Sequence, residues 1–449
     1  MRFPLDRIAD VIGADNPGVA ATIGGWSIDS RTVEAGDLFF ALRGGNHDGH
    51  AFVSDAARKG AVAAVVDRSY DEGGALPLLR TADTLRALQT LAANARREWG
   101  RNVVAVTGSG GKTTTKELIA AFLATAMPVG KTVGNFNNHV GLPLSILRLP
   151  EEARAAVLEI GMNHPGEIRE LAAIAQPSVG VVTNVGHVHM EFFASIDEVA
   201  LAKRELVEAL PPDGAAVLNA DDPLVSRFRE VYAGRVVTFG FSPEADVRAE
   251  ECELQSGGLR LRIGRDAWLE SPLLGRHGAY NLLAAVAVAR VFGIPPGSLV
   301  EAARSVEPGR MRGRRFTHAG ITVFDDCYNS NPEAVRLMLD VLRIVPARRR
   351  IAVLGEMREL GRWSESLHRD VGSYAASCGI HVLIGIRGAA RYTVDEAVKS
   401  GLSDSAAFFC EGPEEAGERA RELAREGDAI LFKGSRGTAV ERALETFLS

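Results

Sequence analysis

The residues best suited to chemistry form a glycine-rich segment at 107–114. It reads Thr-Gly-Ser-Gly-Gly-Lys-Thr-Thr and directly follows an apolar run at 103–106. A buried strand, a glycine turn and a helix start let backbone N–H groups converge on phosphate oxygens. The lysine adds charge, and the next threonine can offer its hydroxyl to Mg²⁺. The segment predicts a nucleotide-phosphate site formed by Thr107, Gly108, Ser109, Gly110, Gly111, Lys112, Thr113 and Thr114.

The glycine spacing of this segment departs from the common phosphate-loop pattern. G-x-x-x-x-G-K-[ST] has its first glycine at the position that Val106 occupies here, and the additional glycine is Gly108. A plain turn between strand and helix is the alternative interpretation. The Gly-Lys-Thr sequence at a strand-to-helix junction favours the phosphate site.

A carboxylate and a histidine follow two further predicted strands. Glu159 lies at the end of an apolar run at 155–160, and His189 comes shortly after a run at 179–183. Ligands of an open parallel sheet bind at the carboxyl ends of its strands, so both side chains should lie near the phosphate loop and could hold Mg²⁺. Taken alone, Glu159 is explained equally well as a surface carboxylate, and His189 as a hydrogen-bonded loop histidine.

Lysine is scarce in this chain. Only seven of the 51 basic residues are lysines, so arginine supplies the ordinary surface cations. Lysine differs from arginine because its compact ammonium can lose its proton and be modified. Lys203 lies on a predicted helix at 196–210, where a solvated lysine is the simpler local interpretation. The scarcity of lysine favours a functional role.

Two motifs near the end of the chain could meet small polar ligands. Residues 324–332, Phe-Asp-Asp-Cys-Tyr-Asn-Ser-Asn-Pro, place two carboxylates at a strand end, where they could bind ribose hydroxyls or a metal. The alternative is an Asx turn that caps the following helix. Residues 431–437, Leu-Phe-Lys-Gly-Ser-Arg-Gly, end a strand in a basic turn suited to a carboxylate. The Arg-rich turn at 309–315 is, on its own, a solvated hinge.

An α/β fold of three domains would position these residues. Residues 1–82 mix short apolar runs with turn clusters, which predicts a small N-terminal α/β domain. Residues 83–308 alternate buried runs with helical stretches and predict a central P-loop domain with a mostly parallel sheet. The pattern restarts in residues 309–449, which predict a Rossmann-like α/β domain with strands at 321–325, 351–354, 382–386 and 429–432.

Composition narrows the classes of function. With 449 residues and 46% hydrophobic content the chain can build several cores, and a formal charge of -6 does not favour non-specific nucleic-acid binding. No run approaches the ~20 apolar residues of a membrane span, and residues 1–10 are too acidic for a signal peptide. Four separated cysteines indicate neither a disulfide framework nor a zinc site. We expect a cytoplasmic monomer without a nucleic-acid partner or membrane insertion.

In their order along the chain, these segments resemble the Mur ligases of bacterial peptidoglycan synthesis. Among these, they resemble the ligases that add D-alanyl-D-alanine to UDP-N-acetylmuramoyl-tripeptide (UDP-MurNAc-tripeptide). Two positions depart from the family pattern, because Gly278 replaces a common Asn and Glu356 replaces an Asp. The resemblance spans essentially the whole chain and is carried by the phosphate loop and by residues 28–31, 36–39, 48–50, 131–138, 159–163, 189–191, 275–281, 324–332, 354–361 and 431–437.

The resemblance implies an ATP-dependent amide ligase that activates a carboxylate as an acyl phosphate. The catalytic residues would be Lys112, Glu159, His189 and Lys203. Besides the phosphate loop, the nucleotide would contact Asn138, Asn281, Arg310 and Asp326. Two Mg²⁺ would be held by Thr113, Glu159, His189 and Lys203, the last as a carbamate. The uridine-nucleotide substrate would meet Ser30, Arg31, Asp48, Gly49 and His50, and the D-alanyl-D-alanine side would use Asn329, Asn331, Lys433, Ser435 and Arg436.

Two alternatives remain open. One is an amide ligase of the same fold with another substrate, such as the Mur ligase that adds a single diamino acid, or a folylpolyglutamate synthetase. The Asp-Asn-Pro-Arg segment expected of the diamino-acid ligase does not occur in this sequence. The other alternative is a P-loop switch or binding module, in which nucleotide only changes the protein's shape. Phosphate release that depends on an acceptor would exclude the switch.

Overall fold

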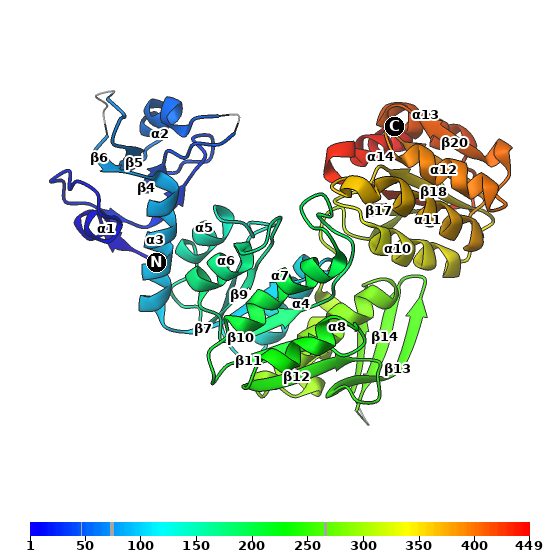
Figure 1. Cartoon of the computed structure of the whole chain (residues 1–449), viewed down its shortest axis with the longest axis horizontal. Coiled ribbons are helices and arrows are strands. Elements are labelled where there is room, and N and C mark those ends of the chain that lie inside the picture. The colour runs from blue at the N-terminus through cyan, green and yellow to red at the C-terminus, as the bar shows by residue number, and fades with distance from the viewer. Residues whose placement is uncertain (46, 72–75, 265–266) are drawn as a thin grey trace.

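The computed structural model describes residues 1–45, 47–71, 76–264 and 267–449. They form three lobes along a V, with a central lobe at its base and the N-terminal and C-terminal lobes at its two tips (Figure 1). Each lobe is built on its own sheet with helices packed against it, so the α/β fold predicted from the sequence is confirmed.

A four-stranded parallel sheet in the order β3-β4-β5-β6 forms the core of the N-terminal lobe, within the described residues. Strand β4 (Asp37–Phe40) is buried along its whole length, because Leu38 and Phe40 pack into a core on one face of the sheet and Phe39 into a core on the other. The other elements are β1 (Phe3–Pro4), α1 (Leu5–Ile12), β2 (Thr22–Ile23), β3 (Gly25–Ser27), α2 (Val53–Arg58), β5 (Ala63–Asp67) and β6 (Leu78–Thr81).

Helix α3 (Thr84–Trp99) joins the N-terminal and central lobes. The Asp83 carboxylate caps its start by accepting a hydrogen bond from the Arg86 N–H, and Gly100 ends it in a left-handed conformation. The helix packs against α1 and also against α5 (Gly141–Leu147) and α6 (Glu167–Ala175) of the central lobe. Because α3 belongs to both lobes, the predicted boundary between residues 82 and 83 remains a prediction.

The central lobe contains a sheet whose described strands run in the order β15-β14-β13-β12-β11-β10-β7-β9-β8. The pairings from β13 to β8 are parallel, and β13, β14 and β15 form an antiparallel extension. Four strands fall where the sequence predicted them: β7 (Asn102–Thr107), β9 (Ala155–Glu159), β10 (Val179–Val182) and β11 (Ala215–Asn219). The others are β8 (Val129–Lys131), β12 (Arg235–Gly240), β13 (Val247–Gln255), β14 (Gly258–Ile263) and β15 (Ala267–Ser271).

Strand β7 shows how helices cover both faces of this sheet. Val103 and Ala105 pack into the core beneath α3, α5, α6 and α7 (Ile196–Glu208), whereas Val104 and Val106 pack beneath α4 (Lys112–Ala124) and α8 (Gly275–Val291). Successive side chains of a strand point to opposite faces, so an uninterrupted apolar run is expected for a strand buried on both. Helix α9 (Val300–Ser305) then leads toward the third lobe.

The C-terminal lobe has a sheet in the order β16-β17-β21-β18-β19-β20, within the part of the chain described. All its pairings are parallel except that of the edge strand β16 (Arg314–His318). The predicted strands are confirmed as β17 (Ile321–Asp326), β18 (Arg350–Gly355), β19 (Val382–Ile386) and β21 (Ala429–Lys433). Its other elements include β20 (Ala407–Cys410), α10 (Pro332–Ile344), α11 (Ser364–Ser377), α12 (Ala390–Lys399), α13 (Pro413–Leu423) and α14 (Val440–Leu448).

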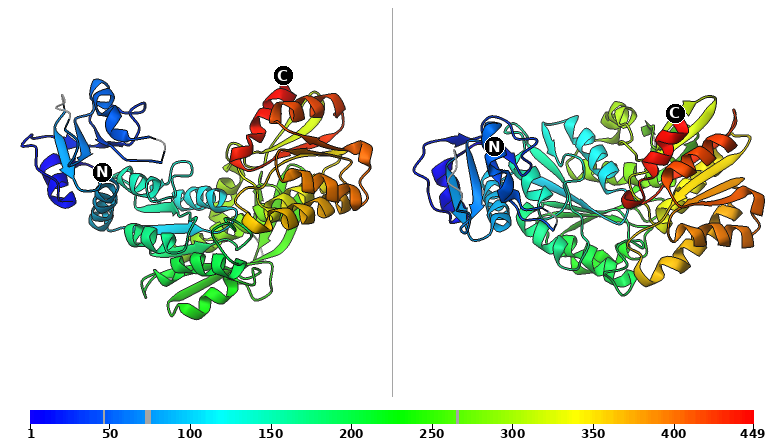
Figure 2. Two further views of the ribbon diagram at one scale, coloured as in Figure 1. Left: turned by 45° about the horizontal axis from the view of Figure 1, so that its top comes forward. Right: turned by 90° about the horizontal axis from the view of Figure 1, so that it is seen from above.

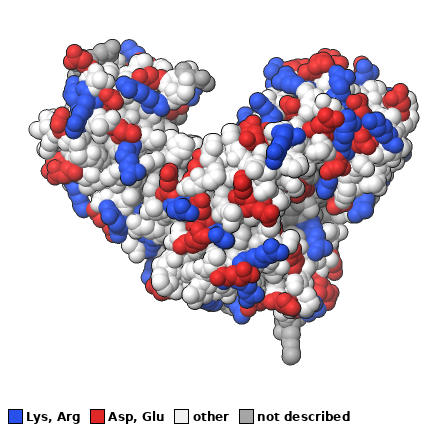
Figure 3. Space-filling model, in the orientation of Figure 1, with Lys and Arg blue, Asp and Glu red and all other residues white. Residues whose placement is uncertain are grey.

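The face of the molecule seen in Figure 3 carries both signs of charge. The space-filling view shows acidic and basic side chains intermixed and a hollow between the two outer lobes (Figure 3). The further views show these lobes standing apart on either side of the central one (Figure 2). No described helix has the length and apolar character needed to cross a bilayer. All four cysteines are free thiols.

Candidate active site

The glycine-rich segment forms a tight turn between β7 and α4, as predicted. Gly108 has φ 147° and Gly111 has φ 77°, both of which favour glycine. A Cβ on Gly108 would lie 1.9 Å from Thr183 Oγ1, and one on Gly111 would lie 2.3 Å from Asn281 Oδ1. Both glycines are therefore required by the close approach of neighbouring side chains as well as by the backbone conformation.

Asn184, just after β10, braces this loop. Its side chain accepts a hydrogen bond from the Gly110 N–H at 2.8 Å and donates one to the Gly110 carbonyl at 3.1 Å. Ser109 Oγ is linked in the same way to Gly186, donating to its carbonyl and accepting from its N–H. The sequence analysis missed Asn184, although it stands at the end of a predicted strand, where functional side chains gather.

Thr113 and Glu159 are brought together as the strand-end argument predicts. Thr113 Oγ1 donates to Glu159 Oε2 at 2.7 Å, and Asn137 Nδ2 donates to Glu159 Oε1 at 2.7 Å. Lys112 Nζ donates to the Gly108 carbonyl at 2.8 Å. Burial lowers the pKa of Lys112, which the Glu159 carboxylate opposes and the Arg312 guanidinium reinforces. The loop thus holds a carboxylate, a hydroxyl and an ammonium close together.

Lys116, the next lysine along α4, is fully buried and supports the Glu159 side of the site. Its ammonium donates to the carbonyls of Thr132 and Gly134 at 2.8 and 2.9 Å. Thr132 Oγ1 in turn accepts a hydrogen bond from the Glu159 N–H. The sequence analysis assigned Lys116 no role, yet the scarcity of lysine was a signal that could have found it.

His189 contacts the C-terminal lobe in this structure. Its backbone is left-handed with φ 56°, and its Nδ1 lies 2.6 Å from Glu359 Oε2. Among the described residues, no three His, Cys, Asp or Glu side chains gather in a way that could hold a metal. The predicted grouping of His189 with Glu159 therefore stays a prediction.

Lys203 is a buried lysine whose ammonium has no partner. Only 2% of its surface is exposed, and it has no hydrogen bond or ion pair with any described residue. Burial lowers its pKa well below 10.5, and the nearby positive charge of Lys112 lowers it further. The solvated-lysine interpretation is therefore wrong, and the side chain is held in a state that favours the neutral amine.

Both asparagines predicted for the nucleotide site accept hydrogen bonds from other residues of the protein. Asn138 Oδ1 accepts hydrogen bonds from the N–H groups of Val140 and Gly141 at the start of α5. Asn281, on α8, is buried beneath the phosphate loop, where its Oδ1 accepts from Thr115 Oγ1 at 3.2 Å. Direct contacts of the two asparagines with nucleotide remain predictions. Their hydrogen bonds within the protein hold the start of α5 and the helix after the phosphate loop in place.

A cavity of about 660 Å³ lies where the central lobe meets the hinge to the C-terminal lobe. Thr113, Lys131 and Asn135 line it from one side, and Arg310 and Tyr328 line it from the other. Its volume falls within the ~300–1,000 Å³ typical of small-ligand sites. The predicted residue Arg310 is therefore placed beside the phosphate loop.

Three residues of this boundary, Arg312, Tyr328 and His277, were not predicted from the sequence. The Arg312 guanidinium stacks 3.9 Å from the centre of the Tyr328 ring, which is also part of the cavity wall. His277 has a buried Nδ1 with no hydrogen-bond partner among the described residues, and burial lowers its pKa to about 4. A buried polar atom without a hydrogen bond is rare in folded proteins, so His277 is a further candidate residue of this site.

The C-terminal motifs form a connected polar network. Lys433 Nζ lies 2.6 Å from Asp326 Oδ2 and donates to the Asn329 carbonyl at 2.9 Å. Asn331 caps α10 by accepting a hydrogen bond from the Ala334 N–H, so the capping alternative is correct for this residue. Ser435 is buried and accepts a hydrogen bond from the Arg358 N–H, while Arg436 is paired with Glu441 at 2.7 Å.

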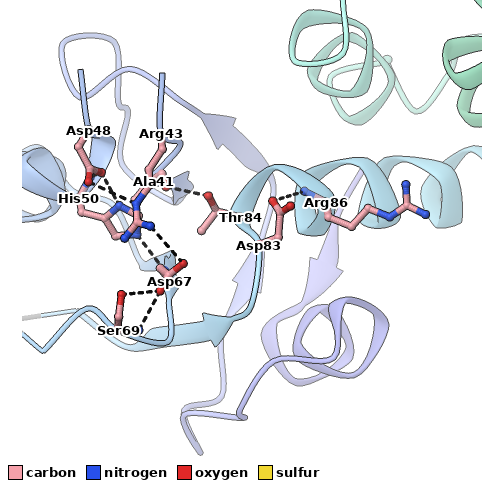
Figure 4. A network of polar contacts seen from close by, with 9 residues as sticks. All are labelled: Ala41, Arg43, Asp48, His50, Asp67, Ser69, Asp83, Thr84 and Arg86. Carbon is pink, nitrogen blue, oxygen red and sulfur yellow. Dashed lines mark hydrogen bonds and ion pairs between the residues drawn. The ribbon is translucent and has the colours of Figure 1, made fainter. Parts of the chain in front are cut away.

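In the N-terminal lobe, His50 holds together the loop predicted to bind the uridine nucleotide (Figure 4). Its Nδ1 lies 2.5 Å from Asp48 Oδ1, and its Nε2 accepts from the Asp67 N–H at 2.9 Å. Arg43 is paired with both carboxylates. Because both ring nitrogens are occupied, His50 shapes this loop, and its contact with substrate remains a prediction.

The other predicted residues of this lobe are Gly49, Ser30 and Arg31. Gly49 approaches Leu42 so closely that a Cβ would come within 2.7 Å of its backbone nitrogen, which explains the glycine. Ser30 is buried, and Arg31 is exposed and paired with Asp29 at 2.7 Å. Hydrogen bonds from Arg31 lower the pKa of Asp29 to about 2.

Comparison with known families gives one result along the whole chain. Residues 22–96 match the model of the Mur ligase family catalytic domain, residues 106–289 the Mur ligase middle domain, and residues 309–436 the Mur ligase glutamate ligase domain. A Bacillus subtilis protein named UDP-N-acetylmuramoyl-tripeptide--D-alanyl-D-alanine ligase is 34% identical, over 95% of this chain and 93% of its own length. The chain is a Mur ligase.

Further relatives of this Mur ligase agree. The Escherichia coli protein of the same name is 33% identical, over 98% of this chain and 97% of its own. A crystal structure of MurF from Acinetobacter baumannii superposes with a TM-score of 0.90 at 29% identity, covering 100% of this chain and 99% of that one. The Thermotoga maritima MurF ligase in complex with ADP gives a TM-score of 0.83 at 29% identity, covering 94% of this chain and 96% of that one. This Mur ligase is an ATP-dependent amide ligase.

Proposed function

We propose that this Mur ligase joins D-alanyl-D-alanine to UDP-MurNAc-tripeptide with cleavage of ATP to ADP and phosphate. The observation that carries the proposal is the cavity in which Thr113 of the phosphate loop lies opposite Arg310 and Tyr328 of the next lobe. The choice of substrates is supported by relatives of that name, which are similar along nearly the whole chain.

The reaction has two steps. The carboxylate at the end of the tripeptide attacks the γ-phosphorus of ATP, forming a P–O bond as the bond to ADP breaks. The amine of the dipeptide then attacks the carbonyl carbon of the acyl phosphate, forms the amide bond, releases phosphate and gives up a proton. The first step brings anions together, so the protein must mainly position the reactants and neutralise their charge. Lys112 and the loop N–H groups would do this at the β- and γ-phosphates.

The residues around Glu159 fit Mg²⁺. The Thr113 hydroxyl and the Glu159 carboxylate are hard oxygen donors and already lie within hydrogen-bonding distance of each other. His189 is the third proposed ligand. When bound, Mg²⁺ would neutralise negative charge on the phosphates. Asn281 would meet the adenine, Asp326 the ribose and Arg310 the phosphates.

Lys203 fits a carbamate, because its buried amine has no partner among the described residues and its pKa is lowered. Carbamylation would convert this unpaired amine near Lys112 into a carbamate, whose oxygens can bind a second Mg²⁺. Arginine could not serve in this role. Lys203 therefore completes the proposed metal set.

We assign the substrates to lobes in the same way. Residues 1–82 would bind the uridine-nucleotide substrate, residues 83–308 ATP, and residues 309–449 would close on ATP and hold the dipeptide. Separate sites on separate lobes favour an open form and a closed form that excludes water from the acyl phosphate. We further propose that the protein acts as a cytoplasmic monomer.

Product formation tests this function. Purified protein with ATP, Mg²⁺ and UDP-MurNAc-tripeptide, carrying either lysine or diaminopimelate, should give a pentapeptide product with D-alanyl-D-alanine, measured by mass spectrometry and phosphate release. Activity with a single diamino acid but not with the dipeptide would contradict the assignment. Nucleotide binding without phosphate release for any acceptor would favour a switch.

A further inference from the structure

The turn after β21 carries the cations proposed for the dipeptide, but both are already paired. Lys433 Nζ lies 2.6 Å from Asp326 Oδ2, and Arg436 Nη1 lies 2.7 Å from Glu441 Oε1. The Asp326–Lys433 pair is largely buried, with the lysine side chain only 3% exposed. Each positive charge is therefore already matched by a carboxylate of the same lobe.

A third cation, Arg358, lies beside this turn, in the segment after β18, and is not paired with any described residue. Its backbone N–H donates to Ser435 Oγ at 3.0 Å, which attaches it to the 431–437 turn. Its guanidinium rests on Gly437, where a Cβ would come within 2.0 Å of Nη1, so the glycine leaves room for it. The residue is exposed, and the guanidinium has no hydrogen bond or ion pair with any described residue.

The position of Arg358 relative to the reacting groups suits a dipeptide. The next residue, Glu359, contacts His189 of the central lobe, so Arg358 lies one residue from the contact between the lobes. An extended dipeptide spans about 7 Å. Its amine can therefore reach toward the central lobe while its carboxylate stays on the C-terminal lobe.

We propose that Arg358 binds the terminal carboxylate of the incoming dipeptide and thereby selects acceptors with a free carboxylate at that position. A guanidinium presents parallel N–H groups that match the two oxygens of a carboxylate. This inference rests on the proposed function, because it names the group that receives one of its substrates. The Ser435 hydroxyl fixes the backbone from which Arg358 extends.

Two acceptors and four proteins test the proposal. The proteins are the wild type, Arg358→Ala, Arg358→Lys and the control Arg419→Ala. The ligation kinetics of each are measured with D-alanyl-D-alanine as acceptor and with D-alanyl-D-alaninamide, which lacks the terminal charge. Arg419 is a cation on α13 paired with Glu422, and its loss serves as a matched surface change. Thermal melting of each variant establishes that it is folded.

Arg358→Ala is expected to raise the KM for D-alanyl-D-alanine by about tenfold to a hundredfold, the usual range for a lost hydrogen bond to a charged group. The KM values for ATP, UDP-MurNAc-tripeptide and the amide should not change, and Arg358→Lys should lie between. An unchanged KM for D-alanyl-D-alanine, or an equal loss with the amide, would overturn the role of Arg358. A wild-type protein that ligates neither acceptor would instead refute the proposed function.

Discussion

Glu359 of the C-terminal lobe holds His189 of the central lobe, with 2.6 Å between Oε2 and Nδ1. This hydrogen bond is the main reason that the pKa of Glu359 is lowered. A carboxylate at Nδ1 fixes the tautomer in which Nε2 keeps its lone pair, the usual arrangement of a histidine that binds a metal. The contact therefore links the proposed Mg²⁺ site to the position of the C-terminal lobe.

We predict that Glu359→Ala raises the Mg²⁺ concentration needed for half-maximal ligation by about tenfold to a hundredfold, as is typical when such a partner is lost. Glu359→Gln, which keeps an oxygen acceptor, should have a smaller effect. Mg²⁺ titrations of activity measure this, with Glu365→Ala as control because Glu365 is an exposed glutamate paired only with Arg369 in the same lobe. An unchanged Mg²⁺ requirement in Glu359→Ala would contradict this role.

A second contact between the same lobes should make stability depend on pH. His187 Nδ1 lies 2.5 Å from Glu333 Oε1, and this hydrogen bond raises the pKa of His187 above its usual 6.5. The stabilisation is complete below pH 6.5 and disappears as the pH rises through the higher pKa of the folded state. Both side chains are partly exposed, so the effect should stay below about 1 kcal/mol.

The corresponding prediction is that His187→Gln lowers the melting temperature at pH 6 and has little effect at pH 9. Melting curves at the two pH values measure it. His139→Gln is the control, because His139 is exposed and its ring has no carboxylate partner among the described residues. An equal loss at both pH values would show that the ion pair is not responsible.

The strands could be predicted where their burial is complete. The valine- and alanine-rich runs of β7 and β9 have a strand on each side and a hydrophobic core on each face, so their sequences reflect burial on both faces. Strand β13 (Val247–Gln255) was missed because much of it is exposed and polar, and pairing with β14 holds it in place. Local composition does not reveal such pairing.

The site could be predicted where the chain itself places residues at strand ends. Thr113 and Glu159 meet because parallel neighbouring strands end at the same edge. Arg312, Tyr328 and Glu359 were missed, since their relation to the phosphate loop and His189 depends on how two lobes pack. Gly278, in contrast, could be recognised in the sequence as a departure from the family pattern. The close packing of this glycine against Leu273 is seen only in the structure.

Restoring the family's asparagine at position 278 should destabilise the protein. A Cβ there would lie 2.9 Å from Leu273 Cβ and 3.1 Å from Leu259 Cδ2. Overpacking of this kind costs about 1–3 kcal/mol. Urea unfolding of Gly278→Asn measures it, with Gly13→Asn as control because no atom lies within 4 Å of a Cβ at that left-handed position. If Gly278→Asn were as stable as the wild type, Leu259 on β14 would have to move away from the new side chain.

Lys116→Met should weaken both folding and nucleotide binding. The substitution removes the donor to two carbonyls, those of Thr132 and Gly134, and the expected loss is about 2–4 kcal/mol in the free energy of unfolding. Because this segment positions Glu159, the KM for Mg-ATP should also rise. Lys131→Met is the stability control, since Lys131 is exposed and is paired with Glu117, which also forms an ion pair with Lys116 at 3.0 Å. Equal stability of the two variants would exclude a special role for the buried ammonium.

Lys203→Arg should abolish ligation, whereas Lys203→Ala should be partly restored by a short carboxylic acid. Arginine keeps a positive charge and cannot form a carbamate, while alanine leaves space in which an added carboxylate can take its place. The lowered pKa of the buried amine keeps it neutral and able to react with carbon dioxide. Bicarbonate labelled with carbon-13 should therefore give a carbamate signal by NMR in the wild type and none in either variant. Wild-type activity of Lys203→Arg would refute the carbamate, because that protein lacks the reactive amine.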